Sequence, residues 1–279
     1  MGISLTAQMT SNLMSLQGTA KLMGITQERL ATGKKVNSAV DDPVAFFDAD
    51  AHYQLAADYA TFKNGMSEAV QTIKAATDTI ESIKNIVTQM KAIATSAKTA
   101  IKGSEAREYI DQFNTLSDQL NNLAGDAIYK GVNLLQDDDL AVVFNTQGDK
   151  LTVQGFDASN VALSVATVAV SASWFTGSVG AGVARASGID AKIVKLDAAI
   201  ATLRGKAKVM ATNLSIVTER QTFTDKMIAT LKIGGDNLTL ADMNEEGANM
   251  LMLQTRQALG IQSLSMASQS AQQVLQLFQ

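Results

Sequence analysis

The chain contains no cysteine, one histidine (His52), one tryptophan and one proline (Pro43) in 279 residues. The absence of cysteine excludes disulfides, thiolate nucleophiles and cysteine metal sites. A lone histidine cannot supply a histidine-rich zinc site. Because proline is the main interruption of helix interiors, a chain with one proline can form very long helices. Aromatic residues make up only 5% of a chain that is 46% hydrophobic, which favours long helices packed side by side.

The charge pattern argues against several classes of partner. The net charge is −4 and the basic residues form no stripe, so a nucleic-acid partner has little support. No apolar run is long enough to cross a bilayer, and no membrane insertion is expected. The first 30 residues lack a basic region followed by an apolar stretch, so they do not predict a cleavable secretory signal.

Apolar residues recur at three- and four-residue spacing in four stretches, a pattern typical of coiled-coil helices. Two stretches lie near the chain ends, and the two longer ones lie between them. Their positions are Met9, Leu13, Leu16, Ala20, Met23 and Leu30; Ile73, Ala76, Ile80, Ile83, Val87, Met90, Ala94, Ala97 and Ile101; Ile189, Ile193, Leu196, Ile200, Leu203, Ala207, Met210, Leu214, Val217, Ile228 and Leu231; and Met250, Leu253, Leu264, Ala267, Ala271, Val274 and Phe278.

Capping residues indicate three helix starts. Asp42 fits an N-cap, with Pro43 at the first helical position. Ser104 is expected to cap a shorter helix over residues 105–123. The run Thr239–Asp242 resembles a capping box that opens the last helix.

Residues 140–183 have a different pattern, with short alternating apolar runs that predict strands. Gly148-Asp149 and residues 157–160 supply turn residues between these runs. The apolar positions are Val142, Phe144, Leu151, Val153, Val161, Leu163, Val165 and Val168. A small strand-rich insertion between two helical halves is therefore expected.

Both terminal helices carry apolar residues on more than one face. Leu22 is adjacent to Met23, and Leu251, Met252 and Leu253 are consecutive. A helix that is apolar on several sides must be buried on several sides. Two such helices in one small molecule cannot cover each other, so we expect burial between subunits.

Five segments resemble one family. Residues 27–43 (QERLATGKKVNSAVDDP) are similar to the N-terminal signature of bacterial flagellins, and Tyr129–Leu135 resembles the turn before their strand region. Ala241–Glu246, Leu259–Ala267 and Ser270–Phe278 resemble their C-terminal segment. The chain looks most similar to alphaproteobacterial flagellins. Residues 140–183 match no family pattern, which is expected because flagellins vary most there.

The resemblance implies a mainly α fold: a long antiparallel coiled-coil helical bundle with paired terminal helices and a small central β insertion. Residues 1–40 with 240–279 would pair as the inner filament core. Residues 41–139 with 184–239 would form the outer core layer, and 140–183 would be a short β-rich variable insertion.

The implied function is a structural subunit, not an enzyme, that polymerises into the extracellular flagellar filament for motility. The implied partners are many copies of the chain itself, the flagellar type III export apparatus with a C-terminal export chaperone, and hook-junction and cap proteins. A hook–filament junction protein of the same superfamily is the alternative. A helical adhesin or surface-active enzyme is a third class, but a flagellin peptidase would need an H-E-x-x-H motif.

Two sets of residues are candidates for functional roles. Candidate assembly contacts are Leu13, Leu16, Leu30, Leu264, Val274, Leu275 and Phe278. O-linked sugars on the strand region are a second hypothesis, with ordinary polar loop residues as its alternative; the hydroxyl residues are Ser159, Thr167, Ser171, Ser173, Thr176 and Ser178.

No residue is assigned a catalytic, cofactor-binding or metal-binding role. The run 137–139 (Asp-Asp-Asp) lacks EF-hand spacing and is interpreted as a solvated loop. His52 lies near two aspartates but has no accompanying nucleophile or pocket pattern. Asp41 and Asp42 are interpreted as helix caps that form an ion pair with Arg29 or Lys34.

Overall fold

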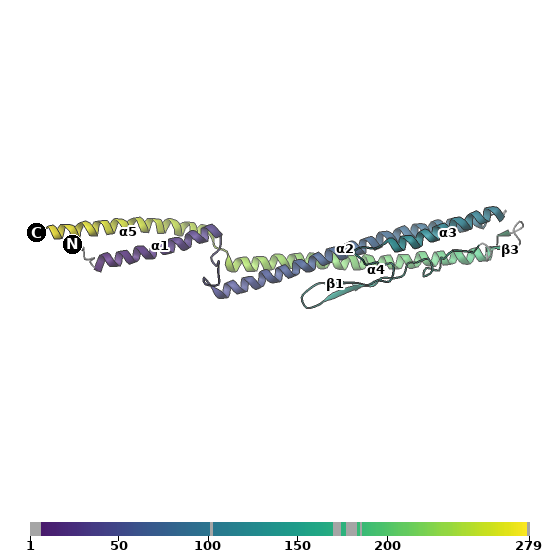
Figure 1. The fold of residues 1–279 in the computed structure, drawn as a ribbon, viewed down its shortest axis with the longest axis horizontal. Coiled ribbons are helices and arrows are strands. Elements are labelled where there is room, and N and C mark those ends of the chain that lie inside the picture. Colours follow the sequence, from purple (N-terminus) through teal and green to yellow (C-terminus); the bar gives the residue numbers. More distant parts are fainter. Residues whose placement is uncertain (1–6, 101–102, 170–173, 177–182, 185, 278–279) are drawn as a thin grey trace. The chain divides into compact units, whose positions relative to one another are not determined.

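The computed structural model describes residues 7–100, 103–169, 174–176, 183–184 and 186–277. Its helices are α1 (Ala7–Thr32), α2 (Pro43–Ala97), α3 (Gly103–Asp126), α4 (Ala186–Thr239) and α5 (Met243–Leu277) (Figure 1). Two antiparallel hairpins pair β1 (Leu140–Val143) with β2 (Lys150–Val153) and β3 (Phe175–Thr176) with β4 (Val183–Ala184). The predicted mainly α fold with a small β region is confirmed.

The chain divides into two compact units. The terminal unit contains residues up to Ala56 and those from Ala229 onward, and therefore holds α1, α5 and one end each of α2 and α4. The central unit, Ala57–Ile228, holds the rest of α2 and α4, all of α3 and the strands.

The core of the central unit lies between α2, α3 and α4. The predicted α2 positions are buried at alternating three- and four-residue spacing, and α3 and α4 bury matching stripes. This spacing keeps one face of a helix against its neighbour along its whole length. The buried positions include Ile73, Ile80, Val87 and Ala94 of α2, Ile110, Phe113 and Leu120 of α3, and Ile189, Leu196, Leu203, Met210 and Val217 of α4. The predicted seam is confirmed, while Ile101 lies outside the described residues.

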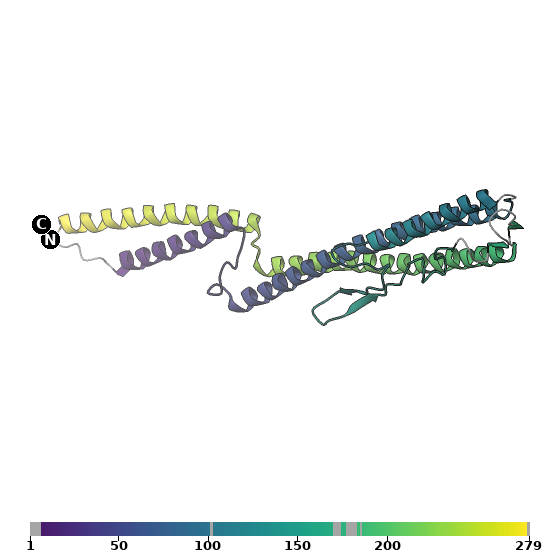
Figure 2. The same cartoon turned by 45° about the vertical axis from the view of Figure 1, so that its right-hand side comes forward.

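Ion pairs give the helix directions in the central unit. Lys98 pairs with Asp190 at 2.7 Å and Lys91 with Asp197 at 2.6 Å, so α4 runs antiparallel to α2. Lys130, in the turn that follows α3, pairs with Glu68 of α2 at 2.9 Å, so α3 also returns along α2. α3 and α4 therefore run in the same direction (Figures 1 and 2). Exposed ion pairs of this kind add little stability, so the apolar core is the main source of the stability of the bundle.

The segment after α3 begins with a tight turn, as the resemblance of Tyr129–Leu135 implied. Tyr129 and Val132 exchange backbone hydrogen bonds at 3.0 Å, and Lys130 and Gly131 between them both have positive φ. Buried Asn133 then donates from Nδ2 to the carbonyls of Ala124 and Gly125 at the end of α3. The turn thus caps a helix end whose carbonyls would otherwise lack donors.

The strand prediction is right for the β1–β2 hairpin and wrong for residues 154–169, which form no strand. Here side chains of α3 replace a neighbouring strand: Asn114 both accepts from and donates to the Val168 backbone, and the Ser117 hydroxyl donates to the Val165 carbonyl. The alternating pair Leu163 and Val165, and Val168 after them, are buried against helices instead of a second sheet layer. An apolar alternation indicates one buried face but does not identify what covers it.

Two helix-cap predictions need correction. Asp42 is the expected N-cap of α2, since its Oδ1 accepts from the Ala45 N–H at 3.0 Å. The last helix, however, is capped by Asp242, whose Oδ1 accepts from the N–H of Asn244 at 2.8 Å. Thr239 is instead the final residue of α4, and its hydroxyl donates to the Gly235 carbonyl. Ser104 lies inside the first turn of α3, so it is not the residue before the helix.

Lys192 of α4 also holds the irregular segment. Its Nζ donates to the Ala166 carbonyl at 2.7 Å and lies 5.4 Å from the centre of the Phe113 ring. Desolvation by burial, with a smaller contribution from Lys195, lowers the pKa of Lys192 from 10.5 to about 8. The amine therefore binds its proton less tightly in the folded protein than in the unfolded chain.

Lys192→Met is expected to change how stability depends on pH. Between the folded pKa of about 8 and the unfolded value of 10.5, the unfolded state binds more protons at this site, so the wild-type free energy of unfolding rises with pH. In the variant, the free energy of unfolding should no longer rise with pH in this way. Urea unfolding at a series of pH values from 7 to 10 measures it. Lys74→Met, at an exposed position on α2, is the control and should keep the rise with pH. Parallel pH profiles for wild type and Lys192→Met would contradict this account.

Candidate assembly surface

In the terminal unit, α1 and α5 lie side by side (Figures 1 and 2). Asn12 donates to the Ser263 hydroxyl at 3.4 Å, and Gly260 allows close approach, because a Cβ added there would lie 2.6 Å from a methyl carbon of Leu16. These contacts bury few apolar side chains. Among the described side chains of the two helices, Met9 and Leu253 are the apolar ones that are buried.

The ion pair predicted for Arg29 has a different partner. Arg29 Nη1 lies 2.9 Å from Oε1 of Glu246, whose side chain is only 8% exposed, so the pair joins α1 to α5. Asp41 instead orders its own loop by accepting from the N–H groups of Ser38 and Asn37. These two bonds, that of Ser38 first, lower the pKa of Asp41. The interpretation of Asp41 and Asp42 as an ion-pair partner of Arg29 or Lys34 is therefore wrong.

The two linkers that lead into α2 and α5 bind each other. Gly33, with φ of 72°, ends α1, and its carbonyl accepts from the Ala241 N–H at 3.0 Å. The Thr239 carbonyl accepts from the N–H groups of Lys35 and Val36. The Gly33-Lys34-Lys35 run is thus one side of a short antiparallel contact.

Tyr53 and Gly235 fit closely where α2 and α4 meet within the terminal unit. The Tyr53 hydroxyl donates to Asp236 Oδ1 at 2.7 Å, which fixes the ring position. A Cβ added to Gly235 would lie 2.8 to 3.2 Å from three ring atoms, closer than real packing permits. No sequence signal identified this pair, because neither residue interrupts the helical pattern.

Large apolar side chains remain exposed on several sides of α1 and α5. On α1 they are Leu13, Met14, Leu22 and Ile25, and on α5 they are Met243, Leu251, Met252, Leu259, Ile261 and Met266. The sequence analysis identified Leu22, Leu251 and Met252 because each has an apolar neighbour in the sequence. Adjacent apolar residues in a helix lie on different faces, and this pattern is the sequence signal for exposed apolar residues on both helices. We refer to these ten residues as the α1/α5 surface.

The sequence-predicted contact residues lie on the same two helices. Leu13 is 40% exposed, while Leu16, Leu30 and Leu264 are half-buried. Val274 and Leu275 lie in α5, and Phe278 lies outside the described residues. Their role in assembly stays a prediction.

Two of the candidate sugar acceptors can be compared. The Ser159 hydroxyl is half-buried and accepts from the Ala162 N–H at 3.2 Å, whereas Thr167 is exposed. Thr167 is therefore the more accessible acceptor. Ser171, Ser173 and Ser178 lie outside the described residues, and Thr176 lies in β3.

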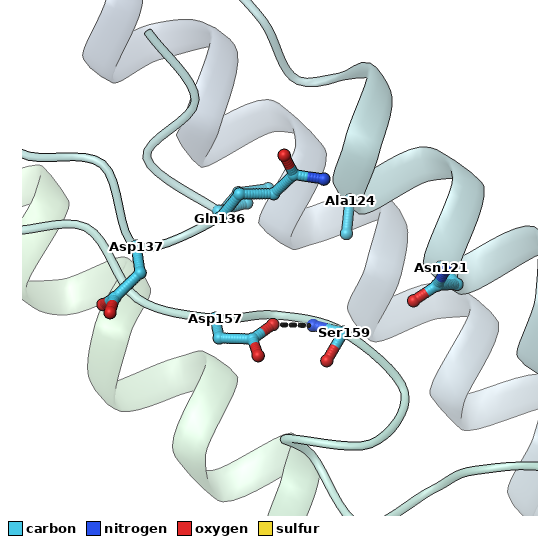
Figure 3. Close-up of a pocket in the computed structure, with 7 residues that line it drawn as sticks. Asn121, Ala124, Gln136, Asp137, Asp157 and Ser159 are labelled. Atoms are coloured by element: carbon cyan, nitrogen blue, oxygen red, sulfur yellow. Dashed lines mark hydrogen bonds between the residues drawn. The ribbon is translucent and has the colours of Figure 1, made fainter.

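The three consecutive aspartates order a loop rather than form a metal site. Asp138 accepts from the Asn133 N–H at 2.9 Å and Asp139 from the Gly155 N–H at 3.1 Å. Asp137 lines an open hollow of about 320 Å³ with Asn121, Asp157 and Ser159 (Figure 3). There Asp157 accepts from the Ser159 N–H at 2.8 Å. Within the described ranges, no three acidic or histidine side chains are grouped so that they could hold a metal ion.

His52 is half-buried, and a Cβ added to Gly234 would lie 3.8 Å from two of its ring atoms. This position packs the imidazole against a helix backbone.

Across the part of the chain that the structure describes, none of the helices is both long and apolar enough to span a membrane.

Comparisons with known proteins agree on one family. The family model of the bacterial flagellin N-terminal helical region matches residues 3–139. Flagellin FljK of Caulobacter vibrioides is 28% identical over 269 residues, covering 95% of this chain and 94% of its own length. A flagellin of Brucella melitensis is 28% identical over 286 residues, covering 95% of each chain. The crystal structure of Bacillus cereus flagellin covers 57% of this chain and 88% of its own, with 18% identity and a TM-score of 0.47.

Gly235→Ala is expected to destabilise the terminal unit by up to about 2 kcal/mol. Alanine favours a helix by about 1 kcal/mol over glycine, but the clash with the anchored Tyr53 ring costs about 1–3 kcal/mol. Gly205→Ala on the same helix meets no atom within 4 Å and should stabilise the protein by about 0.5–1 kcal/mol. Urea unfolding followed by circular dichroism measures both. Shifts of the same sign and size would contradict the packing account.

Proposed function

This chain belongs to the bacterial flagellins, the subunits that polymerise into the flagellar filament, and we propose that its α1/α5 surface forms the subunit contacts. Its relatives include alphaproteobacterial flagellins. The observation that carries the proposal is the number of large apolar side chains that α1 and α5 leave exposed. Among the described side chains of these helices, only two apolar ones, Met9 and Leu253, are buried within the chain.

The magnitude of apolar burial supports these helices as the polymerising element. Leu251 and Leu259 are 67% and 66% exposed, and covering either would contribute about 1–2 kcal/mol. An exposed ion pair contributes at most about 1 kcal/mol. Ten such side chains per subunit can therefore offset the entropy lost when the subunit is immobilised.

We propose the following arrangement in the filament. The terminal helices form the inner layer, where neighbouring copies cover the α1/α5 surface, and the central unit forms the layer outside it. The strand region lies outermost, which leaves Thr167 accessible to O-linked sugars.

The remaining partners follow from the same proposal. A subunit of an extracellular filament must leave the cell, so we propose the flagellar type III export apparatus, a C-terminal export chaperone, and the hook-junction and cap proteins as partners. The family is structural, and we propose no catalytic function for this chain. No observation favours the hook–filament junction alternative, since the relatives that cover nearly the whole chain are flagellins by name.

Leu259→Asn is expected to raise the critical concentration for polymerisation about tenfold or more. The change removes about 1–2 kcal/mol of burial per contact and places an amide in an apolar interface. The monomer should keep its helix content and unfolding free energy to within about 0.5 kcal/mol, because the side chain is 66% exposed. Seeded assembly followed by light scattering and electron microscopy gives the critical concentration.

Val161→Asn is the matched control, because Val161 is 72% exposed but lies in the irregular segment of the central unit. Its critical concentration should equal that of the wild type. If Leu259→Asn polymerises as readily as Val161→Asn, the α1/α5 surface does not form the contacts.

A further inference from the structure

A second row of exposed apolar side chains lies on α4 in the central unit. Val209, Ile216 and Phe223 are 53%, 40% and 49% exposed and are spaced seven residues apart. The buried face of α4 is formed by Leu203, Met210 and Val217, so the exposed row occupies a different face. A seven-residue apolar repeat is typical of a helix packed against another helix. We call Val209, Ile216 and Phe223 the α4 stripe.

Positive charge lies at the start of the α4 stripe. Between Ala198 and Thr218, α4 contains three basic residues, Arg204, Lys206 and Lys208, and no acidic one. Arg204 and Lys208 are exposed, lie one turn apart, and have no ion pair with any described residue. The preceding acids of α4, Asp190 and Asp197, are already paired with lysines of α2.

The outward face of α3 carries the opposite charge. Glu105, Glu108, Asp111 and Asp118 are exposed on the side away from the buried residues of that helix, and none pairs with a described cation. Arg107 is the one basic residue in α3. Beyond the acidic residues, just past the end of α3, Ile128 is 60% exposed. Acidic residues followed by an apolar one on α3 therefore match basic residues followed by apolar ones on α4.

We propose that Arg204, Lys208 and the α4 stripe of one copy dock against the acidic face of α3 and the adjoining Ile128 in a second copy. Copies in a helical filament share one polarity, and α3 and α4 already run in the same direction within a copy. Lys208 opposite Asp118 then places Ile216, eight residues on along α4, opposite Asp126 at the end of α3, two residues before Ile128. At 1.5 Å per residue, both offsets along the helices are about 12 Å.

The contact uses two different surfaces, so each copy offers one of each and can bind two neighbours. Contacts of this kind generate open helical polymers when the rotation between copies does not close into a ring. Opposite charges across the interface would speed encounter and set the alignment of the copies. The inference rests on the proposed filament function and adds to it a lateral contact in the central unit.

Charge reversal on one side or on both tests the proposal. Arg204→Glu with Lys208→Glu, or Asp111→Lys with Asp118→Lys, should each slow seeded elongation about tenfold or more at low salt. The four changes together should restore elongation to within about threefold of the wild type. Lys74→Glu with Lys150→Glu is the control for the Arg204 and Lys208 reversal, since it lowers the net charge by the same amount at exposed positions that have no ion pair with a described residue.

A cross-link supplies an independent readout, because the chain has no cysteine of its own. Filaments of the variant with both Lys208→Cys and Asp118→Cys should form ladders of linked copies on mild oxidation, and neither single variant should. Circular dichroism verifies that all variants are folded. Reversals that elongate like the control, a fourfold variant as slow as its parents, or the absence of ladders would overturn the inference. Failure of the wild type to polymerise would instead overturn the proposed function.

Discussion

Apolar side chains on α1 and α5 outnumber the positions within one chain that could bury them. Each helix can cover only one face of the other, and in the described part of the pair that face contains Met9 and Leu253. We propose that neighbouring copies bury the remaining faces, since exposed apolar surface of this extent is otherwise a source of non-specific association. The pairing of α1 with α5 and the contact between the two linkers hold this surface in place. The central unit has a core of its own.

The two units are stabilised in different ways, and this difference matters for assembly. The central unit has a continuous core from Met66 to Val217, with one hydrophobic seam along α2, α3 and α4. The terminal unit depends on polar contacts such as Arg29 with Glu246 and Tyr53 with Asp236, and on a close glycine–aromatic fit. A helix pair held this way is marginal by itself, so filament formation can supply most of its stability.

How much the sequence could predict depended on whether a pattern repeats. The heptad positions from Ile73 to Ala97 predicted the buried α2 face correctly, because a helix face that is buried along its whole length requires apolar residues at regular intervals in the sequence. Leu163 and Val165 alternate like a strand but pack against helices, since the Ser117 hydroxyl takes the place of a partner strand at the Val165 carbonyl. Arg29 was assigned a nearby acid, whereas its partner Glu246 lies 217 residues away. Contacts made by single side chains between distant segments leave no periodic signal.

Hydrogen exchange on monomer and on filament tests the central claim most directly. The account predicts that amides of α1 and α5 exchange rapidly in the monomer and become strongly protected in the filament, because their apolar faces are covered only by neighbouring copies. Amides of α2 and α4 in the central unit should be protected in both states. Equal and strong protection of α1 and α5 in monomer and filament would contradict the claim.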